Sequence, residues 1–473
     1  MPAFNHSHKN ITRFAIILGL GLVIFLPRPL LGWRYLENAA RYEAQGKFGQ
    51  ASHAYEEASF RCWWQQGLVE NAGFAALKAA DEQNAIRFFT ESFVSGDLSD
   101  QGRMALGELL SKVGQPEKAV TIWKTIGTGS DYAAASFFER AALETGLGSF
   151  YQAADLWRQG LLLDPSNDLA RYNLGLILAA IEPVEAIPEL EQVSGLQAEL
   201  MAKASQLAAG LRETIQSDDL AFQLVGSGRL LASIQEWELA YFAFQNSINL
   251  NPRYSEAWAW LGESAQQLGK DPLPALQRSL ELDPGSITSL AFNGLYFRRN
   301  DQPEKALVLY EKVAQLDPAN ATWQIILGEI HARAGDFATA LDYFQAAVAT
   351  SPLEVQTWQA MLDFSIYYQV YVDQVALEAA IQIFKLEPDS WISFDNMGQV
   401  MMWTGKYDFA DFYFKRSIEI DPDQAASHLH LGLLYLLINR DSEAIPELQK
   451  ALALAPGSPA GLQAGQLLDQ YPP

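Results

Sequence analysis

The stretch WISFDNMGQVMMWTGKYDFADFYFKRSIEIDPD, residues 391–423, places two glycines, one alanine, one aromatic residue and a proline at regular intervals. They are Gly398, Gly405, Ala410, Phe414 and Pro422. The segment 321–354 repeats these residue types at Gly328, Gly335, Ala340, Phe344 and Pro352. Prolines close comparable segments at Pro252, Pro284, Pro318, Pro352, Pro388, Pro422 and Pro456, with separations of 32, 34, 34, 36, 34 and 34 residues. A period near 34 residues indicates a helical repeat array.

Each residue type that recurs in the period has a structural role. A small residue such as Gly398 or Ala410 lets the two helices of a repeat approach closely. Gly405 suits a turn, where the chain often needs a left-handed conformation. Pro422 stands where the second helix has to stop. The opening stretch is therefore predicted to be packing for a repeat rather than the lining of a ligand pocket.

These segments resemble tetratricopeptide repeats, whose pattern is a large residue, Leu-Gly, an aromatic, Ala, an aromatic, Ala and Pro. The resemblance covers most of the chain and implies an all-α, right-handed superhelical solenoid of about twelve helix-turn-helix repeats. Their expected first residues are Gly32, Gln66, Asp100, Ala134, Asp168, Ala221, Ser255, Ile287, Ala321, Val355, Trp391 and Ala425. The resemblance also implies an assembly or adaptor role.

The register divides the chain into five parts. A leader with a membrane segment is expected at 1–31, and about five degenerate repeats at 32–195. An alanine-rich junction helix is expected at 196–220, because the repeat before it ends early. Seven repeats follow at 221–458, and a capping helix with a tail occupies 459–473.

The apolar run Phe14–Leu26 distinguishes the N-terminus from the rest of the chain. As a helix it would cover roughly 20 Å, short of a ~30 Å hydrocarbon core, unless it extends from Ile11 to Trp33. We read it as an uncleaved anchor, with a cleaved signal peptide and a buried apolar helix as alternatives. The expectation is a single-pass membrane protein held in the membrane by its N-terminal helix. Because a short leader more often stays inside, the repeats are expected outside the cytoplasm.

Composition argues against several functions. The formal net charge of −23 disfavours a nucleic-acid partner. Cys62 is the only cysteine, so no disulfide framework or zinc ribbon can form within one chain. The residues of the HLHLG segment, His428 and His430, point to different sides of a helix and lack a further ligand nearby. Nucleotide-binding and hydrolase motifs are also missing. We therefore expect no catalysis, no metal and no cofactor.

Candidate partner-binding residues come from the places of each repeat that face the concave groove. The lysine and asparagine of the carboxylate clamp found in some family members are missing here. The remaining groove candidates are Arg298, Arg299, Arg333, Gln359, Asp363, Asp395 and Gln399, with Met402 and Trp403 as apolar contacts further along. Two roles are open for the arginines. They pair with Glu263 and Glu329 on neighbouring helices, or they anchor a carboxylate or phosphate of a partner.

The sequence thus predicts a membrane-tethered scaffold that binds a protein or peptide in its groove. The alternative is a non-catalytic, substrate-selecting subunit of a cell-envelope glycosyltransferase, export or assembly machine. The oligomeric state and the identity of the partner do not follow from the sequence.

Overall fold

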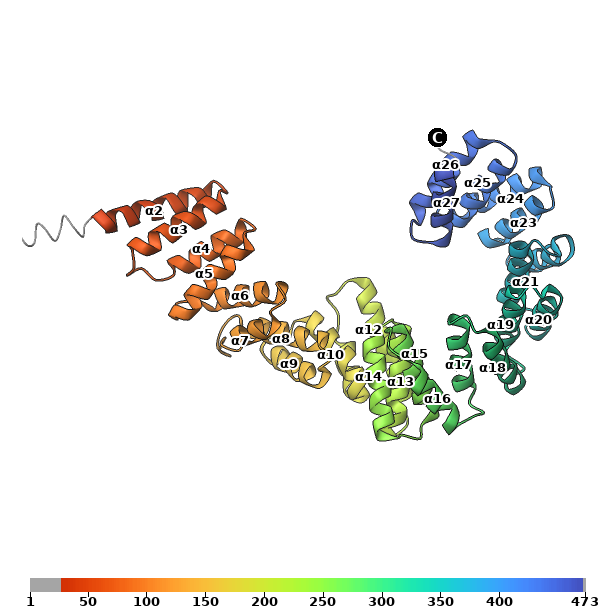
Figure 1. Cartoon of the computed structure of the whole chain (residues 1–473), viewed down its shortest axis with the longest axis horizontal. Coiled ribbons are helices and arrows are strands. Elements are labelled where there is room, and N and C mark those ends of the chain that lie inside the picture. The colour runs from red at the N-terminus through yellow and green to blue at the C-terminus, as the bar shows by residue number, and fades with distance from the viewer. Residues whose placement is uncertain (1–26, 471–473) are drawn as a thin grey trace, which may run out of the picture. The chain divides into compact units, whose positions relative to one another are not determined.

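The computed structural model describes residues 27–470, and within them the chain forms 26 α-helices, one π-helix and no strand (Figure 1). The predicted all-α repeat architecture is confirmed. The right-handed sense of the superhelix stays a prediction. The chain divides into two compact units, Met1–Leu250 and Asn251–Pro473.

The first unit holds five helix pairs, a single helix and a sixth pair. Its helices are α2 (Pro27–Ala44), α3 (Phe48–Arg61), α4 (Leu68–Lys78), α5 (Glu82–Ser95), α6 (Asp100–Lys112), α7 (Pro116–Trp123), α8 (Ala133–Gly146), α9 (Phe150–Leu163), α10 (Asp168–Ile181), α11 (Pro183–Glu191), α12 (Ala198–Thr214), α13 (Leu220–Ser233) and α14 (Trp237–Leu250). The single helix is α12, which packs between α11 and α13, while α10 contacts both α13 and α14. The array therefore continues across α12 without a break in packing. Our division at 196–220 stays a prediction.

The second unit holds six helix pairs and a final helix that packs on the last pair. Its elements are α15 (Ser255–Gln267), α16 (Leu273–Leu282), α17 (Ile287–Arg299), α18 (Pro303–Leu316), α19 (Ala321–Arg333), α20 (Phe337–Thr350), α21 (Val355–Tyr368), η1 (Val372–Ala376), α22 (Leu377–Leu386), α23 (Trp391–Trp403), α24 (Tyr407–Ile420), α25 (Ala425–Leu437), α26 (Asp441–Leu454) and α27 (Pro459–Gln470). The helix α27 contacts both α25 and α26.

Glycines set the distance between the two helices of a repeat. A Cβ atom added to Gly398 would lie 2.5 Å from the ring of Phe414, and one added to Gly228 would lie 2.6 Å from the ring of Phe244. Real Cβ atoms do not approach other atoms so closely, so the aromatic ring of the second helix fills the space that glycine leaves open. This close approach is the packing role predicted for the small residues.

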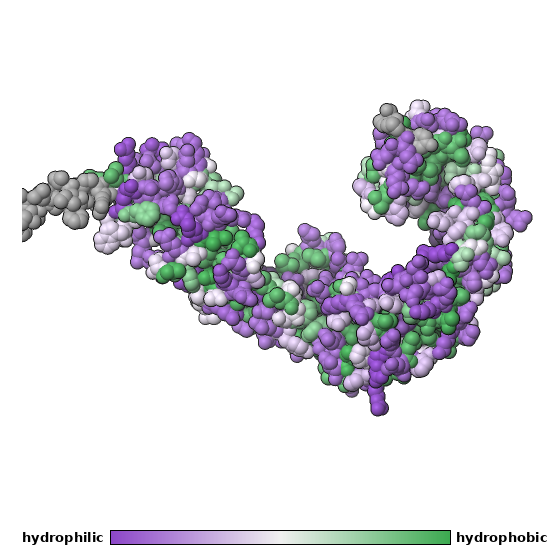
Figure 2. All heavy atoms as spheres, viewed as in Figure 1, coloured by the Kyte–Doolittle hydropathy of each residue, from purple (hydrophilic) through white to green (hydrophobic). Residues whose placement is uncertain are grey.

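The alanines of the second helices share the same burial, and the turn glycines share the same backbone conformation. Ala340, Ala410 and Ala444 are each 0% exposed, as expected for residues at the helix contact. The turn glycines Gly335 and Gly405 have φ of +80° and +74°, in the left-handed region. The face of the molecule shown in Figure 2 carries many hydrophilic residues, with hydrophobic residues scattered among them.

We correct the localisation prediction of a single-pass membrane protein. Within residues 27–470, no helix combines the length and the apolar character needed to cross a bilayer. Residues 27–33, to which the anchor was extended, belong to α2, an 18-residue helix that also carries Arg34, Glu37 and Arg41. The apolar run 14–26 and the leader lie outside the described residues.

Candidate functional site

The first helices of the repeats carry the predicted groove residues of the second unit. We use "first helices" for α15, α17, α19, α21, α23 and α25. Among them, α15 contacts α17, α19 contacts α21, α21 contacts α23, and α23 contacts α25. Because neighbouring first helices stack, residues at equal places of successive repeats come side by side.

Arg298 and Arg299, at the end of α17, are each bound by a carboxylate of a neighbouring first helix. Arg299 Nη1 donates to both carboxylate oxygens of Glu263, at 3.0 Å each. Arg298 Nη1 donates to Glu329 Oε2 at 3.1 Å. Glu263 is buried, so it depends on Arg299 to compensate its charge. For these two arginines, the pairing alternative is the one observed.

Arg333, the last residue of α19, is different. Its side chain is exposed, and within residues 27–470 it takes part in no hydrogen bond or ion pair. It lines an open cavity instead. Its charge is therefore available to a ligand.

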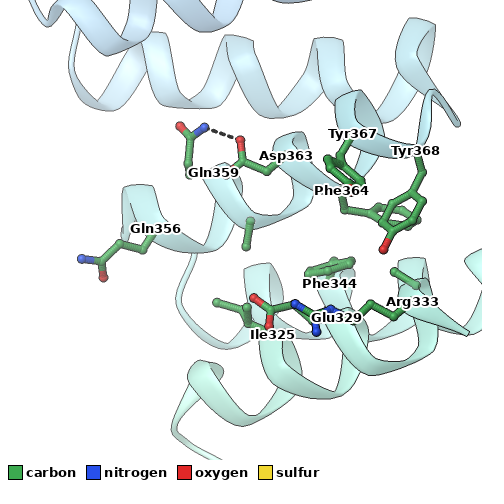
Figure 3. Close-up of a pocket in the computed structure, with 12 residues that line it drawn as sticks. Ile325, Glu329, Arg333, Phe344, Gln356, Gln359, Asp363, Phe364, Tyr367 and Tyr368 are labelled. Atoms are coloured by element: carbon green, nitrogen blue, oxygen red, sulfur yellow. Dashed lines mark hydrogen bonds between the residues drawn. The ribbon is translucent and has the colours of Figure 1, made fainter. Parts of the chain in front are cut away.

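This cavity, with a volume of about 700 Å³, lies between α19 and α21 (Figure 3). Its lining consists of Ile325, Glu329, Ala332 and Arg333 from α19, Phe344 from α20, and Gln356, Gln359, Ala360, Asp363, Phe364, Tyr367 and Tyr368 from α21. The volume is in the range of sites that hold small ligands or side chains. Figure 3 shows Arg333 on one helix and Asp363 on the facing helix, while the rings of Phe364 and Tyr368 gather toward one end. We call this space the α19–α21 cavity.

Stacked aromatic rings make the apolar floor of the α19–α21 cavity. The centroids of Phe344 and Phe364 are 4.9 Å apart with the rings 30° from parallel, and Phe364 lies 5.9 Å from Tyr368. Phe344 and Phe364 are buried, whereas Tyr367 is 80% exposed at the rim. Such a floor favours an apolar or aromatic group of a ligand.

Asp363 provides a carboxylate on the α21 side of the cavity. Gln359 Nε2 donates to its Oδ1 at 2.7 Å. Loss of surrounding water raises the pKa of the Asp363 carboxyl; the Gln359 hydrogen bond and His430 oppose this rise, and Asp395 adds to it. Within residues 27–470 this carboxylate forms no ion pair, so it is open to a basic group of a ligand.

The carboxylate of Asp395, by contrast, has a hydrogen-bond donor and an imidazole as partners. It is buried, accepts from Gln399 Nε2 at 2.9 Å and lies 2.8 Å from His430 Nδ1. Burial lowers the pKa of the His430 imidazole, but the charge of Asp395, the hydrogen bond to it and the charge of Asp363 outweigh burial, so the net shift is upward. Asp395 and Gln399 therefore form a structural pair with His430 rather than an open ligand site.

The two predicted apolar contacts lie apart from the α19–α21 cavity. Met402 is 5% exposed and packs within the hydrophobic core around α21–α25. Its side chain is therefore almost fully withdrawn from solvent and contributes to packing in the core. Trp403 is 42% exposed and lines a smaller space beside Tyr371 and Val372.

An irregular turn borders the cavity. After α21 the chain passes through Gln369 and Tyr371, with φ of +54° and +55°, and then forms the π-helix η1. Both residues hold a backbone conformation that non-glycine residues adopt at a cost. Strained backbone and π-helical turns are concentrated at functional sites. This repeat is also two residues longer than its neighbours, since Pro352 and Pro388 are 36 residues apart.

The sequence reasoning missed the aromatic residues of the cavity. Tyr367 occupies the thirteenth place of its repeat, which is the place of Arg299 and Arg333 in the two repeats before it. The groove candidates of this repeat were the polar residues Gln359 and Asp363, and neither Tyr367 nor the neighbouring Tyr368 was among them. An aromatic residue at a groove-facing place was the available signal.

The stacked helix pairs and the polar and aromatic inner surface define a helical repeat scaffold. A family model described as tetratricopeptide repeat matches residues 293–354 and 405–459. The chain therefore contains tetratricopeptide repeats, and the first matched segment includes α19, with Arg333, and Phe344 of the cavity.

Two curated relatives are similar to this chain. It is 23% identical to the protein CTR9 homolog of Arabidopsis thaliana over 292 residues, which are 52% of this chain and 27% of that protein. It is 23% identical to superkiller complex protein 3 of Mus musculus over 404 residues, 81% of this chain and 24% of that protein. The chain thus spans about a quarter of the length of these relatives.

Among solved structures, one similar chain is a tetratricopeptide repeat protein from Parabacteroides merdae. The sequences are 15% identical, the TM-score is 0.43, and the match covers 53% of this chain and 97% of that chain.

Proposed function

We propose that the protein is an interaction scaffold whose second unit binds a segment of a partner protein at the α19–α21 cavity. The observation that carries the proposal is the cavity itself, an open space of about 700 Å³ with stacked aromatic rings at its floor. A rigid array of helices presents such a surface without reorganising, which lowers the entropic cost of binding.

Three further features support a peptide ligand. The cavity is open to solvent, so a side chain of a partner segment can be inserted from outside. Its wall carries the exposed amide group of Gln356, which can bond a peptide backbone. One curated relative is named as a protein of a complex, which fits a scaffold role for this chain.

The test fills the cavity without changing the rest of the array. Peptides are selected from a displayed random library on the full chain, and their affinity is measured by fluorescence polarisation. Ala360→Arg places a long side chain in the cavity and should weaken binding by at least about tenfold, ~1.4 kcal/mol. Ala349→Arg, at an exposed place on α20, is the matched control and should leave affinity unchanged.

Urea denaturation of both variants verifies that the array is intact. If the selected peptides bind Ala360→Arg as tightly as wild type, the cavity is not the docking site and the proposal fails.

A further inference from the structure

The described groove residues of the second unit differ in whether their charges are already neutralised. Arg298 and Arg299 are bound to Glu329 and Glu263. Asp395 is bound to His430. Within residues 27–470, two charged groups of the groove stay without an opposite charge at ion-pair distance, and they are Arg333 and Asp363.

These two groups line the same cavity. Arg333 comes from α19 and Asp363 from α21, on facing helices in Figure 3. The apolar floor formed by Phe344, Phe364 and Tyr368 belongs to the same space. Among the described residues, the cavity therefore presents one unpaired cation, an apolar floor and one unpaired anion to a ligand, while its third charged side chain, Glu329, is bound to Arg298.

We propose that the α19–α21 cavity selects a partner segment in which an apolar or aromatic residue lies close to one acidic and one basic residue. This inference rests on the proposed function and names the chemistry of its ligand. The acidic side chain binds Arg333, whose guanidinium can hold a carboxylate with two parallel hydrogen bonds. The basic side chain binds Asp363, and the apolar side chain packs on the floor.

The charge pattern confers specificity more than affinity. An exposed ion pair is worth little by itself, but a ligand that seats an apolar side chain also removes water from the adjacent charges. A ligand lacking the matching charge would leave Arg333 or Asp363 partly desolvated and unpaired, which costs more than the pair gains. The ligand therefore needs both charges together with the apolar residue.

The acidic residue is the discriminating part of this pattern. A chain with a net charge of −23 attracts basic peptides at many places. It repels acidic ones, unless a particular site compensates. Enrichment of an acidic residue among the selected peptides would therefore point to a local cation such as Arg333.

The experiment is a charge exchange on the full chain. Random displayed peptides are selected separately on wild type, on Arg333→Glu, and on the double variant Arg333→Glu with Asp363→Lys. Two controls carry the same charge changes on second helices: Arg278→Glu on α16 and Glu378→Lys on α22, both exposed. Affinities of the clones selected on wild type are then measured on every variant.

We expect wild-type clones to carry an acidic, an apolar and a basic residue close together. Arg333→Glu should weaken them at least about tenfold, ~1.4 kcal/mol, and the controls should not. Exchanging the acidic and basic residues within a clone should restore its binding to the double variant. This restoration cannot come from misfolding, because it requires an intact cavity.

Two results would overturn the inference. Clones that Ala360→Arg weakens, but that show no charge pattern and no response to Arg333→Glu, would leave peptide binding at the cavity standing and reject the charge selection. Selected clones that are insensitive to Ala360→Arg would reject both the charge selection and the proposed function.

Discussion

The repeats 321–354 and 355–390 stand next to each other and share the α19–α21 cavity, yet they solve the packing problem in opposite ways. In the first, Gly328 on the first helix faces Phe344 on the second, 3.0 Å from where a Cβ would lie. In the second, the equivalent places hold Leu362 and Ala380, and both are 0% exposed. The large side chain of this contact is on the second helix in the first repeat and on the first helix in the second repeat. The space between the two helices of a repeat therefore has to be filled, and the large side chain that fills it can come from either helix.

Their turns differ as well. The first repeat turns at Gly335, with φ of +80°. The second turns through Gln369 and Tyr371 and enters the π-helix η1 before α22 begins. The two repeats thus fill the contact between their helices to a similar volume, whereas their turns differ in length and conformation.

The largest expected effect comes from breaking the exchanged contact. Leu362→Gly should lower the free energy of unfolding by at least about 3 kcal/mol, because it empties a core site and puts glycine inside a helix. Ala380→Phe alone should cost about 1–3 kcal/mol by overpacking. The double variant recreates the arrangement of the first repeat and should be more stable than Leu362→Gly alone.

Urea denaturation with hydrogen exchange of α21 and α22 measures these differences. Leu353→Ala, which removes an exposed leucine, is the control and should change the free energy of unfolding by less than ~0.5 kcal/mol. A double variant no more stable than Leu362→Gly would show that the two places are not equivalent.

The reverse change in the first repeat should have a smaller effect. Gly328→Leu adds a side chain against the ring of Phe344 and should lower the free energy of unfolding by about 1–3 kcal/mol. Gly457→Leu is the control, because nothing lies within 4 Å of a Cβ at that exposed glycine. Equal urea midpoints for the two variants would contradict the proposed role of Gly328.

Much of this comparison could be predicted from the sequence, because packing repeats with the period. The prolines, the glycine opposite an aromatic residue and the turn glycines locate each helix pair. The exchange of Leu362 and Ala380 could not be seen in the same way, since two additional residues after Tyr368 shift the second helix against the period. The equivalence of Ala380 and Phe344 follows only when the additional turn of η1 is taken into account.

The candidate site was harder to predict than the fold. The sequence places Arg298, Arg299 and Arg333 in the groove but does not say which carboxylates they reach, since that depends on rotamers across neighbouring helices. Met402 was assigned to the groove although its place faces the core. The aromatic floor was missed, because buried packing and a ligand surface use the same residue types.

The smallest expected effect concerns the ionisation of Asp363 at the cavity. The pKa of Asp363 is raised in the folded protein, so the unfolded chain releases this proton at lower pH than the folded chain. The contribution of Asp363 to stability therefore falls as pH rises from its unfolded to its folded pKa. Asp363→Asn lacks this loss and should gain stability relative to wild type over the same interval, with no gain below it.

Thermal midpoints from about pH 4 to about pH 8 test this sign, with Asp342→Asn on the exposed face of α20 as control. The other charged groups near Asp363 are Glu329 and Arg333 on α19, Asp395 on α23 and His430 on α25. A difference between Asp363→Asn and wild type that does not vary with pH would contradict the raised pKa.

The irregular turn after α21 has a consequence for how such arrays diverge. The two additional residues of the repeat 355–390 fall in the turn, so Ala376 at the end of η1 and Ala380 and Ile383 of α22 all remain 0% exposed. The additional residues extend the turn after the cavity residue Tyr368, and α21 and α22 still pack on their neighbours. The length of a turn can thus differ between two repeats of one array while the buried face of the second helix stays the same.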